Sequence, residues 1–339
     1  MSEGLSPIRE WSDVDQTCFE QEILPLNQPA VMRGLANHWP IVQKMQESAH
    51  AAGEYLKSFD KGNPLYTILG SPEIEGRFFY SDDLTGVNFQ RTRGSLSVIV
   101  DQLQTLGEHA PAIAIQAAEV EEALPGFTGE NAMPLLAPEI RPTLWMGNQA
   151  LVAPHYDVHD NIACVVMGER TFTLFPPEQI SNLYIGPTLN APGGVPISMV
   201  DLNNPDLETY PRFADALAAA QQATLQPGDA IFIPTPWWHA VQSLADINVL
   251  INYWWGGVPV PAANTRPLSP NHSLIHSMMT IAKMSPDQRE SWRQFFNYLV
   301  FQTGEDPTAH LPDGLNDLVT NLSPEQRQAV YQLLKDQLN

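Results

Sequence analysis

Two short segments of the chain carry residue types that can hold a divalent metal ion. His155 and Asp157 are two residues apart, and on a β-strand this spacing sends both side chains to the same face. His239 follows an aromatic pair in a distant segment and is the natural third ligand. Two imidazoles and one carboxylate leave further coordination positions of an ion open, as in non-haem Fe(II) sites that activate oxygen. We therefore expect these three side chains to form a metal site.

The residues around each histidine determine how strongly the spacing supports a metal site. A His-x-Asp spacing alone is weak evidence, because the chain contains 9 histidines. Residues 227–234 strengthen it, since they read as a tight turn followed by a buried strand that leads towards His239. The alternative is that His155 and His239 are ordinary hydrogen-bonded core residues. If the strand stays regular, His159 faces the same side and contacts substrate; otherwise it lies behind the metal ligands or at the rim of the site.

The elements that must position these side chains are predicted to be short strands. Between residues 141 and 259, apolar, β-branched and aromatic runs alternate with Gly, Pro and Asn, which is typical of a sandwich or barrel. Residues 1–110 mix short helical patterns with turns. We expect a β core over 111–260 with a helical insertion at 180–226, and 1–110 as an α/β support region packed on that core.

Residues 261–339 are predicted to be helical. The segments SPDQ (285–288) and SPEQ (323–326) each place Ser at the N-cap, Pro at the first helical position and Gln three residues after the Ser. The first helix carries an apolar stripe at helical spacing, formed by Trp292, Phe295, Phe296 and Leu299. Such a stripe usually packs in the core of its own chain. The alternative is that it forms an interface between two copies of the chain, and on that reading we expect a homodimer.

The composition excludes several classes of protein. The chain has 17 Lys and Arg against 38 Asp and Glu, a net charge of -21, so we expect no nucleic-acid partner. No run approaches the roughly 18 apolar residues of a membrane span, and the N-terminus lacks an apolar signal segment, which predicts a cytoplasmic protein without a membrane partner. Cys18 and Cys164 lack metal-type spacing and are expected to be reduced.

Several segments of the chain resemble a known family, the JmjC-like cupin (cupin-like 8) oxygenases, in the branch that includes the hypoxia-inducible-factor asparaginyl hydroxylase and many bacterial cupin-like proteins. The diagnostic segments are 155–177, 227–239 and 248–255, and weaker similarity covers 28–40, 76–89 and 121–127. The resemblance implies a mainly β fold with flanking helices, namely a double-stranded β-helix or jelly-roll core with a C-terminal helical segment. It also implies Fe(II) bound by the His-Asp-His set, with 2-oxoglutarate as co-substrate.

The resemblance further implies residues that bind this co-substrate. The cation for its far carboxylate maps onto Arg170, where the family usually has a lysine. Arg170 facing the solvent is the alternative. Other contacts map onto Asn161, Asn252 and Trp254. At two positions where the family has hydroxyl groups this chain has Ala114 and Val152, so metal binding is the firmer expectation.

The expected function is therefore that of an Fe(II)- and 2-oxoglutarate-dependent dioxygenase, a hydroxylase that acts on a protein or peptide side chain or on a small molecule. The alternative is a non-oxidative metal-binding cupin, a binding or structural protein that does not use 2-oxoglutarate. The altered co-substrate positions motivate this alternative. Histone demethylation is disfavoured, because no chromatin-reading module is evident in the sequence.

Overall fold

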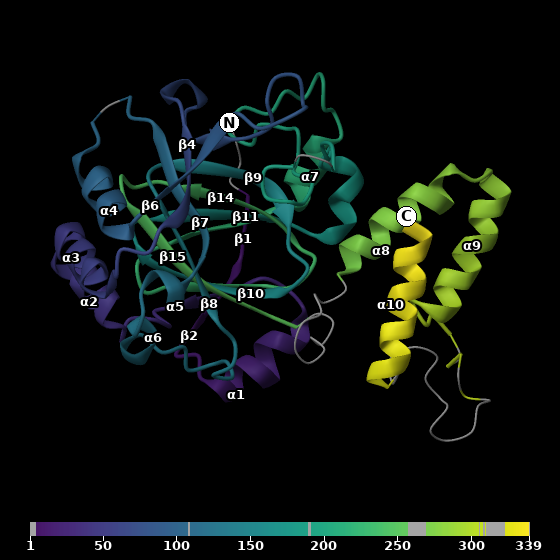
Figure 1. Cartoon of the computed structure of the whole chain (residues 1–339), viewed down its shortest axis with the longest axis horizontal. Helices are drawn as coiled ribbons and strands as arrows, with labels where there is room; N and C mark the ends of the chain where they lie inside the picture. The colour runs from purple at the N-terminus through teal and green to yellow at the C-terminus, as the bar shows by residue number, and fades with distance from the viewer. Residues whose placement is uncertain are drawn as a thin grey trace. The chain divides into compact units, whose positions relative to one another are not determined.

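The structure is a computed structural model that describes residues 5–107, 109–188, 191–256, 269–304, 306–307, 309 and 323–338. The chain divides into two compact units, 1–267 and 268–339. All strands of the described residues belong to the first unit, and the described elements of the second are helices (Figure 1).

Two mixed sheets form the first unit. The six-stranded sheet consists, in spatial order, of β1 (Ser6–Pro7), β12 (Gln221–Leu225), β11 (Arg170–Phe175), β14 (Trp238–Ser243), β9 (Ala150–Tyr156) and β5 (Arg77–Phe78). The nine-stranded sheet consists of β2 (Arg9–Ser12), β3 (Ala30–Arg33), β13 (Ala230–Ile233), β10 (Asp160–Met167), β15 (Asn248–Trp255), β8 (Pro142–Gly147), β7 (Ala112–Glu119), β4 (Leu65–Gly70) and β6 (Phe89–Gly94). This is a mainly β fold with flanking helices and a jelly-roll core, as expected.

Short helices connect and cover these strands. They are α1 (Gln16–Cys18), α2 (Pro40–Glu47), α3 (Ala49–Phe59), α4 (Leu96–Thr105), α5 (Val120–Ala123), α6 (Phe127–Glu130) and α7 (Phe213–Ala219). Single helical turns of other types lie at η1 (Phe19–Ile23), η2 (Leu24–Leu26), η3 (Pro72–Ile74) and η4 (Pro177–Asn182). Helices α2, α3 and α4 pack their apolar residues against the nine-stranded sheet in the largest core cluster.

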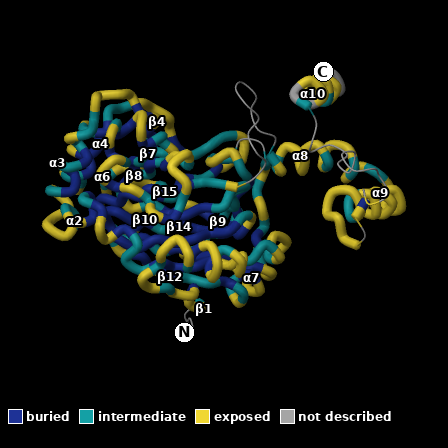
Figure 2. Tube along the Cα trace, turned by 90° about the horizontal axis from the view of Figure 1, so that it is seen from below, coloured by how far each residue is buried: buried dark blue, intermediate teal, exposed yellow. Residues whose placement is uncertain are grey.

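The predicted core strands are confirmed, and β10 shows why their pattern is so apolar. Its residues Ile162, Cys164 and Val166 pack into the cluster beneath the helices, while Ala163 and Val165 pack into the cluster between the two sheets. Burying a side chain of this kind stabilises the fold by roughly 1.5–3 kcal/mol. The strand is therefore apolar on both faces, and Figure 2 shows it with β9 and β14 in the buried layer.

The region 1–110 contributes strands to both sheets, so it is not a separate layer on the core. Strand β3 pairs with β13, and β4 pairs with β7 and carries β6 at the sheet edge. Strand β5 pairs with β9 in the other sheet. Strands β3, β4 and β5 each supply backbone hydrogen-bond partners to a core strand that would otherwise lie at the edge of its sheet.

The segment predicted as a helical insertion, 180–226, is only partly helical. Helix α7 packs Phe213 and Ala216 against Phe175 and Trp238. The end of the segment instead forms β12, which pairs with both β11 and β1. The insertion therefore ends before residue 221, because pairing with β11 determines the structure of its last residues.

The second unit contains α8 (Pro270–Thr280), η5 (Ile281–Lys283), α9 (Pro286–Leu299) and α10 (Pro324–Leu338). Both predicted helix starts are confirmed. At α9 the Ser285 hydroxyl accepts from Gln288 N, and Gln288 Oε1 accepts from Ser285 N at 3.1 Å. At α10, Ser323 and Gln326 form the same pair of bonds. Neither α8 nor α9 buries any side chain, so the apolar stripe on α9 is not part of a core within the described residues.

Two further expectations concern the chain as a whole. Cys18 and Cys164 form no disulfide, and Cys164 is buried in β10. Burial raises the pKa of the Cys164 thiol, which keeps it protonated. Among the described residues, no helix has the length and the apolar character that a membrane span requires.

Candidate metal centre

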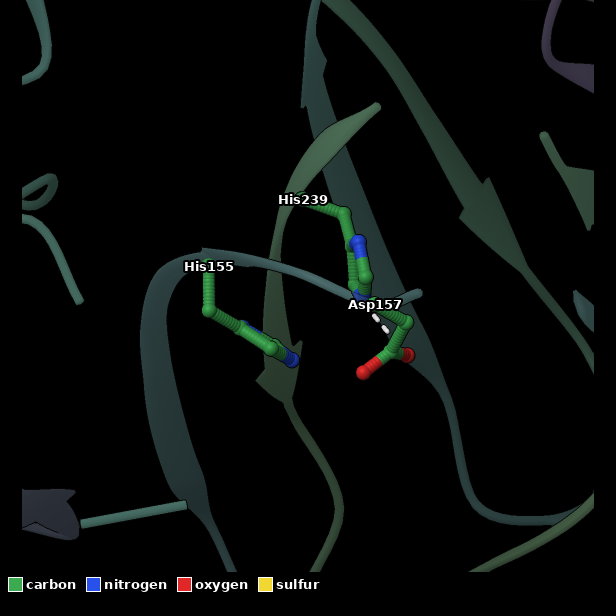
Figure 3. A group of neighbouring side chains, drawn as sticks. All are labelled: His155, Asp157 and His239. Carbon is green, nitrogen blue, oxygen red and sulfur yellow. Dashed lines mark ion pairs between the residues drawn. The ribbon is translucent and has the colours of Figure 1, made fainter. Parts of the chain in front are cut away.

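His155, Asp157 and His239 converge on one point. One ligand atom from each residue lies within 4.8 Å of the others. The His239 Nε2 atom lies 3.6 Å from Asp157 Oδ2, and the two imidazole centroids are 4.2 Å apart. Figure 3 shows the carboxylate and both rings directed towards a common space. Since metal–ligand bonds to these residue types are about 2.0–2.2 Å long, this spacing suits three ligands of a single ion.

Two paired strands and one turn position the three side chains. His155 in β9 lies directly opposite His239 in β14, and the register of the pair shifts just beyond this point. Strand β9 ends at Tyr156, so Asp157 lies in the turn that follows and not on the strand that was predicted to carry it. The turn is held by Thr235, whose hydroxyl donates to the Asp157 carbonyl at 2.9 Å. The predicted convergence is therefore reached through a turn.

Hydrogen bonds orient each ligand. The Nδ1 atoms of His155 and His239 lie 2.9 and 3.2 Å from the carbonyl oxygens of Ala153 and Trp237. A carbonyl can only accept, so Nδ1 carries the proton and Nε2 has a free lone pair for a metal. Burial, and next the adjacent His155, lower the pKa of His239 to about 4, although Asp157 acts in the opposite direction.

Neutral imidazole is the form that binds metal, so His239 is in the ligating state at neutral pH. The carboxylate of Asp157 is oriented in turn by Trp254, whose indole Nε1 donates to Oδ2 at 3.3 Å. A set of two imidazoles and one carboxylate suits Fe(II) and similar divalent ions. The donor set thus fits the predicted metal, and an ordinary core histidine pair does not require these three groups to converge.

A cavity of about 270 Å³ adjoins the triad between the two sheets. All the residues expected to contact a co-substrate line this cavity: Asn161, Arg170, Asn252 and Trp254. Asn252 is fixed from both sides, because its amide donates to Asn161 Oδ1 at 3.0 Å and its oxygen accepts from Trp145 Nε1 at 2.8 Å. Trp145 also packs edge to face on Trp254. Two hydrogen-bonded groups, one of Asn161, Asn252 and Trp145 and one of Trp254 and Asp157, are thus joined by an aromatic contact in the cavity wall.

Arg170 is the buried cation of the cavity. Its side chain is only 8% exposed, so the alternative in which it faces the solvent is wrong. Its Nε has no hydrogen-bond partner among the described residues, and burial lowers its pKa to about 10. Leu174, four residues along β11, lies opposite His239, which places Arg170 about 13 Å along the strand from the triad. A buried guanidinium without a partner is unstable unless an anion completes the site.

The remaining predicted positions divide into two groups. Ala114 and Val152 both line the cavity, so two apolar side chains stand where the related family has hydroxyl groups. His159 is not among the lining residues. It lies in the bend after β9, and the regular strand on which its predicted contact depended ends at Tyr156.

The sequence reasoning missed four polar lining residues: Gln116, Trp145, Asn148 and Ser243. In β8, Trp145 lies between buried Leu144 and Met146, so strand periodicity was a usable signal for it. Ser243 is four residues after His239 in β14, a spacing that places two residues on the same face of a strand. No local pattern marks Gln116. Its position depends on an irregularity in the pairing of β7 with β8.

Comparisons with known proteins agree with this geometry. Residues 16–259 match the family model described as a cupin-like domain. The chain is 40% identical over 112 residues to lysine-specific demethylase JMJ31 of Arabidopsis thaliana, covering 33% of this chain and 20% of that protein. It is 26% identical to lysine-specific demethylase 8 of Xenopus tropicalis, covering 70% of this chain and 50% of the relative. Against tRNA wybutosine-synthesizing protein 5 of Danio rerio it is 25% identical, covering 83% and 87%. The chain thus spans half or less of the two demethylases.

Proposed function

Since the chain belongs to the family of the cupin-like domain, we propose that it is an Fe(II)- and 2-oxoglutarate-dependent oxygenase. The observation that carries this proposal is a single cavity with two functional ends. One end has the converging His155, Asp157 and His239, and the other has the guanidinium of Arg170, whose Nε has no hydrogen-bond partner in the described part of the chain. A protein that only binds a metal needs the first end and gains nothing from the second, which destabilises the fold.

In this proposal His155, Asp157 and His239 hold Fe(II), and Arg170 binds the far carboxylate of 2-oxoglutarate through its planar pair of N–H donors. When bound, Fe(II) and the 2-oxo acid would supply the activation of O₂, in which one oxygen atom enters a substrate C–H bond and the other enters succinate, with release of CO₂. The single guanidinium replaces the hydroxyl donors that are missing at Ala114 and Val152.

The protein contributes orientation and exclusion of water. Trp254 fixes the Asp157 carboxylate, and the hydrogen bond to Asn252 fixes the Asn161 amide in the wall. Phe172 and Leu250 supply apolar walls between the two ends of the cavity. An apolar enclosure strengthens the charge interaction with Arg170 and keeps water from reactive intermediates.

The experiment is an anaerobic titration of the metal-free protein with Fe(II) and then 2-oxoglutarate. We expect a weak visible charge-transfer band that requires both components, with oxygen-dependent formation of succinate afterwards. Asp157→Ala is the control and should give no band. Metal binding without a band, and without succinate, would instead establish the non-oxidative metal-binding cupin.

For the substrate we propose hydroxylation of a protein or peptide side chain, with a small molecule as the alternative. Hydroxylation of an N-methyl carbon leads to loss of the methyl group as formaldehyde, so methylated peptides belong among the candidates. The demethylase names are those of the relatives and do not select between these outcomes. Mass spectrometry distinguishes them, because hydroxylation adds one oxygen and demethylation removes one CH₂.

The organisation of the chain adds three further proposals. We propose that residues 111–260 are the catalytic core, which 1–110 supports, and that 261–339 mediate homodimerisation. Support for the dimer comes from exposed apolar side chains on α9, with Trp292 42% and Phe295 57% exposed. We also propose a cytoplasmic location, which two unpaired cysteines favour.

A further inference from the structure

The cavity reaches the surface at a β-bulge in β7. Ile115 lies opposite Met146 and Ala118 opposite Leu144, so two residues of β7, Gln116 and Ala117, face one residue of β8. Ala117 has a φ of 48°, an uncommon conformation for a residue other than glycine. Both bulge residues line the cavity, Gln116 is half-buried and Ala117 is exposed. The bulge is therefore part of the cavity mouth.

The sheet face that lines the cavity continues outwards across two more strands. Ala114 in β7 lies opposite Ile68 in β4, and Ile68 lies opposite Arg91 in β6. These three side chains share one face, because directly paired residues point to the same side of a sheet. The same face therefore leads from a residue that lines the cavity to a cation at the sheet edge.

Two residues further along, Tyr66 in β4 lies opposite Arg93 in β6. The pairing of β4 with β7 ends at Thr67 and Ile115, and Gln116 is the next residue of β7 beyond that pair. Neighbouring strands lie about 4.8 Å apart, so Arg93 is roughly 10 Å from the bulge strand. We call this surface the basic ledge, and it consists of Gln116, Tyr66, Arg91 and Arg93. Figure 1 shows its three strands β7, β4 and β6 side by side.

The two arginines of the basic ledge have no carboxylate partner in the described part of the chain. Arg93 donates to the Tyr66 hydroxyl at 2.6 Å and its guanidinium lies 4.3 Å from that ring centroid, while Arg91 lies 5.2 Å from the Phe89 centroid. In contrast, Arg33 and Arg141 each form an ion pair. In a chain with 38 acidic and 17 basic side chains, two adjacent exposed cations without a carboxylate are available for an external anion.

The aromatic contacts hold these cations in place. Tyr66 is 61% exposed, and its ring supports the Arg93 guanidinium while leaving the other N–H groups free. Strand β6 is the last strand of its sheet, so its outer backbone groups lack a strand partner among the described residues. Charged side chains on an edge strand also oppose aggregation. That protective role does not require two adjacent arginines on the sheet face that, at Ala114, also lines the cavity.

We propose that the basic ledge recognises the substrate, by binding acidic side chains of an extended peptide whose target residue enters the cavity. This inference rests on the proposed oxygenase function and specifies its substrate class. Arg91 and Arg93 are two residues apart, about 6.6 Å along a strand, so the preferred peptide carries acidic residues at alternate positions. Gln116 offers an amide donor and acceptor to the peptide backbone at the cavity mouth.

A peptide fits better than a nucleic acid. The net charge of -21 repels a polyanion over its whole length, whereas two arginines are sufficient to pair with two carboxylates. The overall negative charge of the protein repels a polyanion more than it repels a neutral peptide. The preference of the basic ledge for an acidic peptide therefore depends mainly on the two short-range contacts with Arg91 and Arg93.

The test measures binding of fluorescein-labelled extended peptides to the full-length protein by anisotropy. The probes are a neutral peptide, the same peptide with Asp at two alternate positions, its Lys counterpart, and an oligouridine. We expect the Asp peptide to bind most tightly and to weaken as ionic strength rises, because exposed charges are screened over about 8–10 Å at 0.1–0.15 M salt. Arg91→Glu and Arg93→Glu should each weaken it by about fivefold or more, since each replaces an attraction by a repulsion.

Arg9→Glu is the matched control. Arg9 stacks at 4.1 Å over Trp11 in β2, at the opposite edge of the same sheet, so the variant makes the same change in net charge far from the cavity. The inference is overturned if the Asp peptide binds no better than the neutral one, or if Arg9→Glu weakens it as much as Arg93→Glu. Preferential binding of oligouridine would also overturn it and assign the surface to RNA. Failure of the proposed oxygenase function would appear separately, as a missing charge-transfer band in the wild-type protein.

Discussion

At the scale of single residues, Arg170 combines a cost to stability with a role in binding. A buried cation without a partner destabilises the fold, so Arg170→Met should raise the free energy of unfolding by about 1–3 kcal/mol. If Arg170 binds the far carboxylate of 2-oxoglutarate as proposed, the same change removes those charged hydrogen bonds, and the affinity for 2-oxoglutarate should fall about 10–100-fold. Urea denaturation measures the first effect, and titration calorimetry of the Fe(II)-loaded protein measures the second.

A comparison with an exposed arginine makes this prediction specific. Arg212 donates to the Ser181 carbonyl at 3.0 Å and stacks over Tyr184. Arg212→Met should leave 2-oxoglutarate affinity unchanged and should not stabilise the fold. If Arg170→Met binds 2-oxoglutarate as tightly as the wild-type protein, Arg170 has no part in co-substrate binding.

Trp254 acts on the metal through Asp157. Its indole N–H is a donor to the ligating carboxylate, and loss of such a bond typically lowers metal affinity 10–100-fold. Trp254→Phe keeps most of the ring packing against Trp145, so we expect about tenfold weaker Fe(II) binding in a folded protein. Competition with a chelator measures this affinity. Trp255→Phe is the matched control, because Trp255 stacks on Phe232 in the core and should not affect the metal.

Most of the candidate site could be predicted from residue types, and the exceptions have physical reasons. His155 and His239 were predicted from the His-x-Asp spacing and from the turn and apolar strand before His239, and strand pairing brings the two residues directly opposite each other. The carboxylate of Asp157 was assigned correctly to the cluster but to the wrong local structure, since the strand ends one residue earlier. Gln116 could not be predicted, because a bulge depends on the register between two strands and leaves no local pattern.

At the scale of elements, α4 depends on a residue from another segment for its N-terminal cap. Its own N-cap residue, Ser95, makes no side-chain cap bond, and Asp60 Oδ2 instead accepts from Ser97 N and from the Ser97 hydroxyl at 2.8 and 2.6 Å. Burial alone raises the pKa of Asp60, but the bonds from Ser97 and Gly62 outweigh it and leave the pKa below its usual value. The carboxylate form of Asp60 therefore stabilises the folded protein.

Replacing this cap should have an effect that depends on pH. Because the folded pKa is lowered, the stabilisation is present at neutral pH and is lost as the pH falls below about 4 through the folded pKa. Asp60→Ala should lower the free energy of unfolding by about 1 kcal/mol at pH 7, and the difference from wild type should shrink on acidification. Urea denaturation across this range tests it, with exposed Asp246→Ala as the control. A difference that grows in acid would contradict this role of the carboxylate.

The elements themselves differ in how far sequence alone predicts them. Strand β10 is recognisable because it is apolar on both faces, and α9 because its capping box is local. Strand β12 was absorbed into a helical insertion, since an Ala-rich run precedes it and its strand conformation depends on pairing with β11. Elements with a sequence pattern of their own can thus be predicted locally. A strand whose conformation depends on pairing with another strand can be identified only once the sheet is known.

At the scale of the whole molecule, the described residues of the helical unit carry many exposed apolar side chains. Exposed apolar side chains on α8 and α9 and in the residues after α9 include Leu274, Met278, Met279, Trp292, Phe295, Leu299 and Phe301. Large exposed apolar patches usually mark protein interfaces. A second copy of the chain supplies an apolar surface of the same kind, and a stable dimer buries about 1,200–2,000 Å² in total.

Sedimentation velocity at micromolar concentration should therefore give a dimer for the wild-type protein. Phe295→Asp, at a position 57% exposed, places a charge within the apolar surface and should give a monomer, because an unpaired carboxylate in a buried interface is strongly unfavourable. Val98→Asp is the matched control, since Val98 in α4 is similarly exposed at 52% but lies outside the helical unit. A wild-type monomer, or a Phe295→Asp dimer as stable as the Val98→Asp dimer, would exclude this face of α9 as the interface.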